Sequence, residues 1–199
     1  MNTDINLAKR TLRSSVQQRL RAVSPEQRQA GSQAICDQVL SHPAWKKSQI
    51  VLLFAPFREE PDIWPVVAAG LAAGKLVHLP KLDPAGFTFH ASQVRDVVND
   101  LAPGKFGNLE PRLTSAAMAL NRLDLVLVPG VAFDAQGRRL GRGKGFYDRL
   151  LTQVSGMTCG VAFDEQIVET VPVEPHDIRL NCILTPTRLI ETEGRAVFE

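Results

Sequence analysis

The chain has 199 residues, 44% of them hydrophobic and 22% charged, and its formal net charge at pH 7 is +2. This size and composition predict a globular protein with a substantial buried core and exclude a disordered or fibrous chain. The longest apolar runs, residues 66–74 and 125–133, have nine residues each, about half of the roughly 18 to 20 that cross a bilayer. No transmembrane helix is therefore predicted.

The first part of the chain predicts two helices and a strand. Apolar residues recur every three or four positions over residues 6–22, which indicates an amphipathic helix. Ser24 followed by Pro25 and Gln27 is a helix-capping pattern, so a second helix is expected to run to about Leu40. The continuous apolar run 49–55 is typical of a strand that is covered on both faces.

The middle of the chain continues with a helix and two strands. Asp62 can cap a helix that ends at Gly74, and residues 76–80 predict the next strand. Alternating apolar and polar residues over 87–91 predict a half-exposed strand at an edge of the sheet. Residues 100–113 contain two glycines and two prolines, and they are expected to form a loop.

The last part of the chain repeats the alternation. A short helix is expected before Asn121, and residues 123–128 predict a fully buried strand. Helical residues 145–154 and strands at 157–163 and 182–184 complete the pattern. Such alternation predicts an α/β fold with three layers, α/β/α, and a mainly parallel, Rossmann-like central sheet, in a single domain that spans the chain.

The most specialised segment is rich in glycine. Five of the fourteen glycines lie between Gly130 and Gly145, directly after the buried strand at 123–128. Glycine lets the backbone approach a ligand, and the start of a helix offers free N–H groups, so this combination favours phosphate binding. The two standard nucleotide fingerprints do not match, because Arg138 and Phe146 occupy positions where they require glycine. A solvated glycine turn is the structural alternative.

The charges are concentrated in two basic islands. Residues 1–28 carry six basic and two acidic side chains, and residues 134–150 carry five basic and two acidic ones. The remainder of the chain is net acidic. Two localised islands indicate anion sites more than a general nucleic-acid surface, with a solvated charged face as the alternative.

The Gly-rich segment, Arg139-Leu-Gly-Arg-Gly-Lys-Gly-Phe-Tyr-Asp148, resembles the signature of the 5-formyltetrahydrofolate cyclo-ligase family, also called 5,10-methenyltetrahydrofolate synthetase. The resemblance extends over most of the chain, in matching order and spacing. Further similar segments are 9–13, 54–62, Glu110–Pro111, 125–134 and 171–177.

The resemblance implies conversion of 5-formyltetrahydrofolate to 5,10-methenyltetrahydrofolate, with ATP and Mg²⁺ required and ADP and phosphate released. By similarity, the residues that contact ATP are Lys9, Arg10, Thr11, Leu12, Arg13, Arg139, Leu140, Gly141, Arg142, Gly143, Lys144, Gly145, Phe146 and Tyr147. The implied folate contacts are Phe57, Asp62, Arg142 and Phe146. The implied metal ligands are Asp148 and Asp177. The implied catalytic residues are Arg142, Lys144 and Tyr147.

The implied chemistry agrees with these residue types. An N-formyl oxygen is a poor leaving group, so transfer of the γ-phosphoryl group to it gives an iminium phosphate. N10 then attacks, the ring closes and phosphate leaves. Such a step depends on positioning and charge neutralisation, and it needs no nucleophilic Ser or Cys.

Two residues depart from the family pattern. Ile63 stands where threonine is common, which removes a hydroxyl near the substrate. Phe146 stands where tyrosine is frequent, so a phenolic hydrogen bond is lost while the ring can still stack on the pterin. Activity is expected to survive both changes.

The same side chains also have structural interpretations. Asp148 at a helix start can interact with the helix dipole or with its neighbour Arg149. Lys9 and Arg13 can form a solvated helix face, Asp62 can be only a helix cap, and Phe57 can be a core residue.

Two other functions compete with the enzyme: a protein that holds nucleotide and folate without turnover, and a nucleic-acid-binding module. The second is disfavoured because few aromatic side chains accompany the basic islands. We therefore expect a small-molecule substrate, no nucleic acid and no membrane partner, and a monomer. The N-terminus lacks the features of a signal peptide, which predicts a cytoplasmic location. The three cysteines are widely spaced without a CxxC pair, which predicts reduced structural thiols.

Overall fold

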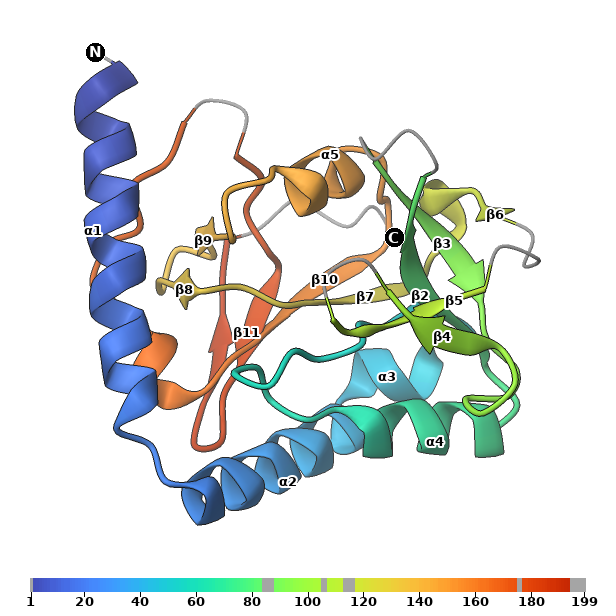
Figure 1. The fold of residues 1–199 in the computed structure, drawn as a ribbon. Coiled ribbons are helices and arrows are strands. Elements are labelled where there is room, and N and C mark those ends of the chain that lie inside the picture. The colour runs from blue at the N-terminus through green and yellow to red at the C-terminus, as the bar shows by residue number, and fades with distance from the viewer. Residues whose placement is uncertain (1, 84–87, 105–106, 113–116, 175–176, 194–199) are drawn as a thin grey trace.

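The computed structural model describes residues 2–83, 88–104, 107–112, 117–174 and 177–193 (Figure 1). The chain begins with two long helices, α1 (Asn2–Arg21) and α2 (Pro25–Ser41), as predicted. The capping pattern is present, since the Ser24 hydroxyl accepts from the backbone N–H of Gln27 and the Gln27 side chain accepts from the Ser24 N–H. This reciprocal pair sets the sharp corner between α1 and α2.

The described strands of the main sheet lie in the order β12-β11-β10-β7-β1-β2-β3-β6. The five from β11 to β2 run parallel to one another, whereas β3, β6 and β12 pair antiparallel. Their bounds are β1 (Ile50–Leu52), β2 (Leu76–Leu82), β3 (Phe89–Gln93), β6 (Ala117–Met118), β7 (Leu125–Val128), β10 (Met157–Val161), β11 (Cys182–Leu184) and β12 (Leu189–Glu191). The prediction of a mainly parallel central sheet is confirmed.

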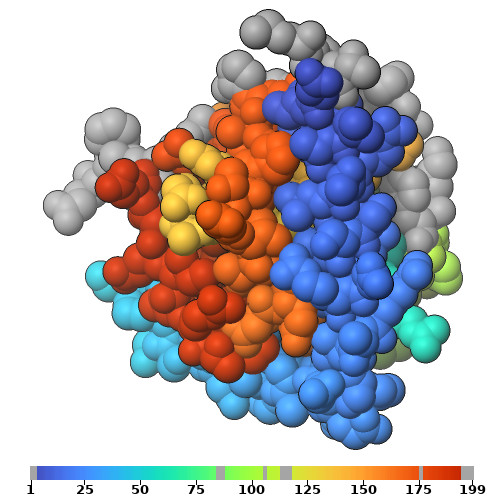
Figure 2. Space-filling model, turned by 90° about the vertical axis from the view of Figure 1, so that its left-hand side faces the viewer, coloured from blue at the N-terminus to red at the C-terminus, as the bar shows by residue number. Residues whose placement is uncertain are grey.

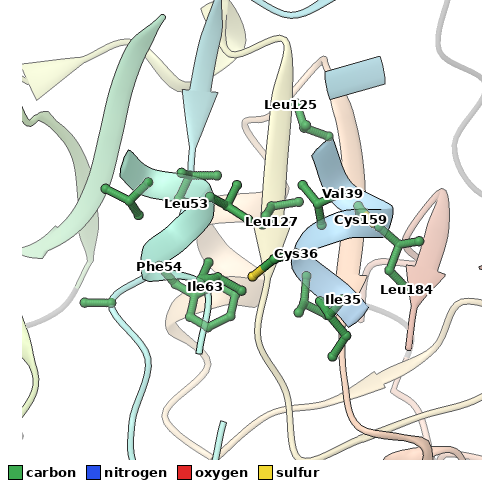
Figure 3. Close-up of a cluster of buried hydrophobic side chains, with 14 of the residues drawn as sticks. Ile35, Cys36, Val39, Leu53, Phe54, Ile63, Leu125, Leu127, Cys159 and Leu184 are labelled. Atoms are coloured by element: carbon green, nitrogen blue, oxygen red, sulfur yellow. The ribbon is translucent and has the colours of Figure 1, made fainter. Parts of the chain in front are cut away.

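Helices cover both faces of the sheet (Figure 1). On one face lie α2, α3 (Pro43–Lys47) and α4 (Trp64–Ala72), and on the other lies the short α5 (Phe146–Leu151). Cys36 and Val39 of α2 belong to one buried cluster with Leu53, which follows β1, Leu127 of β7 and Cys159 of β10 (Figure 3). The fully apolar runs predicted for the central strands therefore follow from burial on both faces.

Helix α1 stands at one end of the molecule and not over the sheet. It lies along the segment that includes η2 (Asp164–Gln166), and Figure 2 shows the blue helix beside this orange segment. Only Val16 and Leu20 of its apolar residues are fully buried. Most side chains of α1, including its basic ones, are therefore not used to cover the sheet.

The sheet contains a topological switch point between β1 and β7. From β1 the chain moves outward to β2, and β7, β10 and β11 build the sheet in the opposite direction. In open α/β sheets a crevice forms at the carboxyl ends of the two strands where the order reverses. This is the position at which a ligand site is expected.

Several elements differ from the sequence-based expectation. Residues 100–113 were expected to be loop, but the segment contains a hairpin of β4 (Leu101–Pro103) and β5 (Leu109–Pro111), with prolines only at the strand ends. Gly104 is required there, because a Cβ would lie 2.4 Å from Glu110. The Gly-rich segment likewise contains a small hairpin, β8 (Ala132–Phe133) with β9 (Arg139–Leu140).

Other predicted elements are shorter or lie elsewhere. The strand predicted at 87–91 is β3, which is not at the edge because β6 pairs with it; Phe87 lies outside the described residues. Where a short helix was expected before Asn121, residues 113–116 lie outside the described residues, residues 117–118 form β6, and a 3₁₀ turn, η1 (Leu120–Arg122), follows. The first strand ends at Leu52, because the chain leaves the sheet there to line a cavity. The elements α3 and β12 carried too short a pattern to be predicted.

All three cysteines are buried, and none of them is in a disulfide in the structure. Among the residues that the structure describes, no helix is both long enough and apolar enough to cross a bilayer.

Candidate functional site

A cavity of about 400 Å³ opens at the switch point, between the segments that follow β1 and β7. The chain after β1 supplies Phe54, Ala55, Phe57 and Glu60; the chain after β7 supplies Pro129 and Gly130. Strands β2, β3 and β5 supply Pro80, Phe89 and Glu110, and Asn108 lies directly before β5. The rest of the lining comes from the Gly-rich segment, namely Arg139, Gly141, Arg142, Lys144, Gly145, Phe146, Tyr147 and Asp148.

One wall of the cavity is aromatic. The Phe89 ring lies 4.8 Å from the Phe146 ring and 5.8 Å from the Tyr147 ring, measured between centroids. The Arg142 guanidinium group lies 4.4 Å above the centre of Phe57. Aromatic faces with a stacked guanidinium group suit a flat, conjugated ligand.

A buried carboxylate lies beside this wall. The Glu60 side chain is 7% exposed, and its Oε1 accepts from Nε and Nη2 of Arg142 at 3.3 and 3.1 Å. Its Oε2 accepts from the Phe57 backbone N–H at 3.0 Å. Burial raises the pKa of the Glu60 carboxyl group, and the hydrogen bonds from Phe57 and Arg142 offset part of this rise. The carboxylate is therefore held in place while it faces the cavity.

The Gly-rich segment turns sharply into α5. Gly143 and Gly145 have φ values of +95° and +65°, which only glycine adopts readily. Gly141 has no room for a side chain, because a Cβ would lie 2.8 Å from Nη1 of Arg139. These positions explain the glycines at the cavity mouth.

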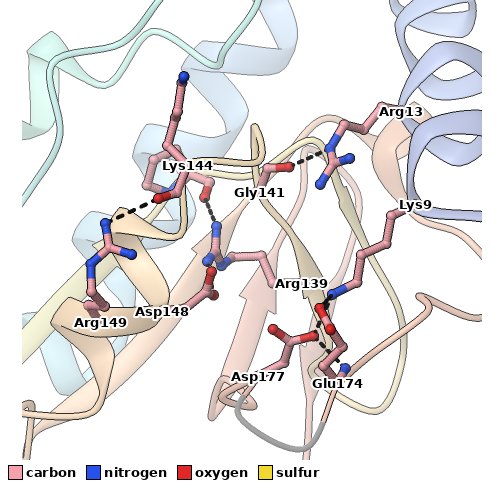
Figure 4. Close-up of polar contacts among 10 residues, drawn as sticks. Lys9, Arg13, Arg139, Gly141, Lys144, Asp148, Arg149, Glu174 and Asp177 are labelled. Carbon is pink, nitrogen blue, oxygen red and sulfur yellow. Dashed lines mark hydrogen bonds and ion pairs between the residues drawn. The ribbon is translucent and has the colours of Figure 1, made fainter. Parts of the chain in front are cut away.

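Arg139 is the most buried cation of the site. Its side chain is 3% exposed, and Nη2 lies 2.5 Å from Oδ1 of Asp148 (Figure 4). Its guanidinium group lies 5.6 Å from the Tyr147 ring centre, and its Nε has no hydrogen-bond partner in the described part of the chain. The Nε is itself buried, so Arg139 can reach a ligand only through other atoms of its guanidinium group.

Tyr147 and Lys144 differ in their surroundings. Burial raises the pKa of Tyr147, assisted by the negative charge of Glu60, so its hydroxyl remains protonated. Lys144 is exposed at the cavity mouth, and its backbone carbonyl accepts from Nη2 of Arg149 at 3.1 Å. Tyr147 is thus fixed as a hydrogen-bond donor, whereas the Lys144 side chain is free to reach an anion.

The two basic islands meet at this cavity. Arg13 of α1 donates from Nε to the carbonyl oxygen of Gly141 at 2.9 Å. Lys9, one helical turn earlier, forms ion pairs of 2.9 Å with Glu174 and Asp177. Of the other predicted α1 contacts, Arg10 and Thr11 are exposed and Leu12 packs against the core.

The predicted folate contacts divide into two groups. Phe57, Arg142 and Phe146 line the cavity, whereas Asp62 does not. Asp62 Oδ1 accepts from the backbone N–H of Trp64 at 3.0 Å, so it satisfies the first N–H of α4 from the position before the N-cap residue Ile63. Glu60, two residues earlier, is the carboxylate at the cavity. Sequence reasoning passed over it, although its position after a buried strand was a usable signal.

The predicted metal ligands are both engaged by cations. Asp148 pairs with Arg139 and Asp177 with Lys9, and the described residues contain no group of three His, Cys, Asp or Glu side chains that could hold an ion. Mg²⁺ often binds through one or two carboxylates together with phosphate and water oxygens. The carboxylates of Asp148 and Asp177 therefore suit a Mg²⁺ ion whose other ligands are phosphate oxygens of a nucleotide and water.

Comparison with known proteins shows the family of this chain. The model of the 5-formyltetrahydrofolate cyclo-ligase family matches residues 5–186. The chain belongs to this family. A 5-formyltetrahydrofolate cyclo-ligase of Escherichia coli strain K12 is 37% identical over 185 residues, which cover 88% of this chain and 99% of the relative. A mouse protein of the same name is 32% identical over 193 residues, covering 90% and 94%.

Solved structures of the cyclo-ligase family share the fold. The 5,10-methenyltetrahydrofolate synthetase of Aquifex aeolicus superposes with a TM-score of 0.83 at 34% identity, and 96% of each chain is covered. The synthetase of Mycoplasma pneumoniae gives 0.72 at 21% identity, covering 89% of this chain and 98% of that one, and this shows the fold alone. The family resemblance, the α/β fold and the assignment to the ligase class are confirmed.

Proposed function

We propose that the protein converts 5-formyltetrahydrofolate to 5,10-methenyltetrahydrofolate, with ATP and Mg²⁺ required and ADP and phosphate released. One observation carries this proposal. A single cavity joins an aromatic wall and a buried carboxylate, suited to a pterin, to a Gly-rich segment with basic side chains, suited to a triphosphate. Membership of the cyclo-ligase family supports the same reaction.

The folate part of the proposal rests on the inner end of the cavity. A pterin presents ring N–H and amino donors on one edge, and the Glu60 carboxylate is a fixed acceptor for such donors. Phe57 and Phe146 offer ring faces for stacking. Specificity would come from the carboxylate, because a ligand with N–H donors on this edge adds charge-assisted hydrogen bonds to those that Phe57 and Arg142 already donate.

The nucleotide part rests on the cavity mouth. Arg13 of α1 reaches the Gly-rich segment, Lys9 of the same helix pairs with Glu174 and Asp177, and Arg139 and Lys144 belong to the Gly-rich segment. Asp148 and Asp177 would hold Mg²⁺, which supplies charge neutralisation on the triphosphate. No other step is required of the metal.

The side chains then divide the chemistry as follows. Arg142 and Lys144 stabilise the negative charge on the phosphoryl group as it passes to the formyl oxygen. Tyr147 donates a hydrogen bond, because its hydroxyl stays protonated. N10 of the folate closes the ring and phosphate departs. The enzyme supplies position and charge, and no covalent intermediate with the protein is needed.

The test is direct. Purified protein with Mg²⁺, ATP and 5-formyltetrahydrofolate is expected to develop the methenyltetrahydrofolate chromophore, with one ADP released for each ring closed. A folded protein that binds both substrates by calorimetry but forms no chromophore would be the non-catalytic binding protein instead. A mobility shift with nucleic acid, without folate binding, would favour the nucleic-acid-binding module.

The remaining expectations belong to the same proposal. We propose that residues 1–199 act as one cyclo-ligase domain, as a monomer in the cytoplasm. The sedimentation coefficient of the purified protein tests the monomer, and fractionation of the source cell tests the location.

A further inference from the structure

Lys9 is held between two carboxylates that come from the same short segment. Its Nζ lies 2.9 Å from Oε2 of Glu174 and 2.9 Å from Oδ2 of Asp177 (Figure 4). The three side chains are 11%, 25% and 12% exposed, in that order. Lys9 and Asp177 already have places in the proposed nucleotide site, whereas Glu174 has none.

Glu174 fixes both of its neighbours. Its carboxylate accepts from Lys9, and its backbone N–H donates to Oδ2 of Asp177 at 2.7 Å. A mostly buried ammonium group needs charged partners, and here both come from beyond β10, more than 160 positions along the chain from Lys9. The contact therefore ties α1 to the C-terminal part of the molecule.

We propose that Glu174 is a positioning residue of the nucleotide site, which keeps the Lys9 ammonium group in place for the triphosphate when Asp177 turns to a metal ion. This inference rests on the proposed function. A lysine ammonium group has three N–H donors, and Glu174 and Asp177 occupy two. Within the described residues no third acceptor contacts this group, so a phosphate oxygen can accept from the third donor without the loss of either ion pair.

The need for a second carboxylate follows from charge. Once a divalent cation binds Asp177, that carboxylate attracts Lys9 less strongly, because its charge is shared with the metal. Lysine has a long, flexible side chain that gains considerable freedom when released into water. Glu174 supplies the anchor that prevents this release.

Two measurements on Glu174→Gln test the proposal. The first is acetic anhydride labelling of the Lys9 amine without nucleotide, quantified by mass spectrometry against Lys46 and Lys47 of the same protein. The Lys9 side chain is only 11% exposed and two carboxylates contact its ammonium group, so the wild-type amine is shielded from the reagent. We expect Lys9 labelling to rise severalfold in the variant.

The second measurement separates nucleotide from folate binding. The Kd for Mg·ATP, measured by calorimetry, is expected to weaken about tenfold, which corresponds to the loss of one charge-assisted hydrogen bond. The Kd for 5-formyltetrahydrofolate is expected to stay unchanged, because Glu174 does not line the cavity. The unchanged folate Kd also certifies that the variant is folded.

Glu169→Gln is the matched control, since Glu169 is exposed and lies five positions earlier in the same connection. It should leave Lys9 labelling and both Kd values as in wild type, and Glu174→Asp should recover part of the nucleotide affinity. The inference is overturned if Glu174→Gln keeps wild-type labelling and wild-type Mg·ATP affinity. It is also overturned if folate and nucleotide affinity fall together. Wild-type protein that does not bind Mg·ATP would overturn the proposed function as well.

Discussion

The Nε atom of Arg13 donates to the carbonyl oxygen of Gly141, across 128 positions of sequence, at 2.9 Å. The guanidinium group also lies over Gly143, where a Cβ would be 3.6 Å from Nη2. One side chain of α1 thus contacts two glycines of the proposed phosphate segment. The segment is held in shape before any nucleotide arrives, which reduces the entropy lost on binding.

Replacement of Arg13 by alanine is therefore expected to weaken Mg·ATP binding by about tenfold or more, because both a cation and a loop contact are lost. Folate affinity should change little. Calorimetric titration of each ligand measures the two effects. Arg19→Ala is the control on the same helix, since Arg19 is exposed and has no ion pair within the described residues. Equal losses in Arg13→Ala and Arg19→Ala would contradict a specific role for Arg13.

Glu60 should matter chiefly for folate. The substitution Glu60→Gln keeps the size of the side chain but removes the charge that holds both the ligand donors and Arg142. We expect the KM for 5-formyltetrahydrofolate to rise roughly ten- to a hundredfold, since a hydrogen bond to a charged group contributes about 1.5 to 3 kcal/mol. Steady-state kinetics with saturating ATP measure this change.

The neighbouring carboxylate provides the control for Glu60. Glu59 is 61% exposed and lies 3.6 Å from Nη2 of Arg142, so Glu59→Gln perturbs the same arginine without altering the buried acceptor. Its KM for folate should stay within about twofold of wild type, as for most exposed ion pairs. A Glu59→Gln effect as large as that of Glu60→Gln would show that Arg142, and not the carboxylate, determines folate binding.

The contrast between Glu60 and Asp62 shows where sequence reasoning ends. The periodicity of α1 and α2, the apolar runs of the parallel strands and the glycines of the Gly-rich segment are local signals. They predicted the α/β fold that the structure shows, and the Gly-rich segment lines the cavity at the switch point. Which of two acidic residues faces the cavity depends on the path of the chain after β1. That path is set by packing between distant elements, so no local pattern encodes it.

The same limit applies to Glu110 and Glu174. Glu110 lines the cavity, with its carboxylate 3.0 Å from Nζ of Lys81, only because the segment expected to be loop forms the β4–β5 hairpin. Glu174 meets Lys9 only because α1 stands at the end of the sheet. Both contacts join residues that are far apart in sequence, and a single sequence without its fold gives no signal for them.

Asp62 is expected to act on stability and not on the reaction. Its Oδ1 accepts from the first N–H of α4, so Asp62→Ala should lower the free energy of unfolding by about 1 kcal/mol, whereas Asp62→Asn should retain most of the cap. Urea denaturation measures the loss. The KM for folate should be unchanged in both variants. A raised KM in Asp62→Asn would instead restore Asp62 as a folate contact.

His78 predicts a pH dependence of stability. The side chain lies on the central strand β2, is 1% exposed, and its Nδ1 is 3.0 Å from the carbonyl oxygen of Leu76. Burial lowers the pKa of His78 below its ordinary value, and the contact with the Leu76 carbonyl oxygen offsets part of this decrease. Below a pH of about 6.5 the unfolded chain binds a proton that the folded chain does not, so stability is complete above that pH and falls as the pH decreases.

Urea denaturation at pH 7.5 and pH 5.5 measures this dependence. His78→Leu removes the titrating group and should reduce the difference in unfolding free energy between the two pH values, whatever its effect on absolute stability. His42, whose pKa burial also lowers, contributes in the same direction. His42→Gln should therefore reduce the difference further. A difference of equal size in wild type and His78→Leu would exclude His78 as a source of acid sensitivity.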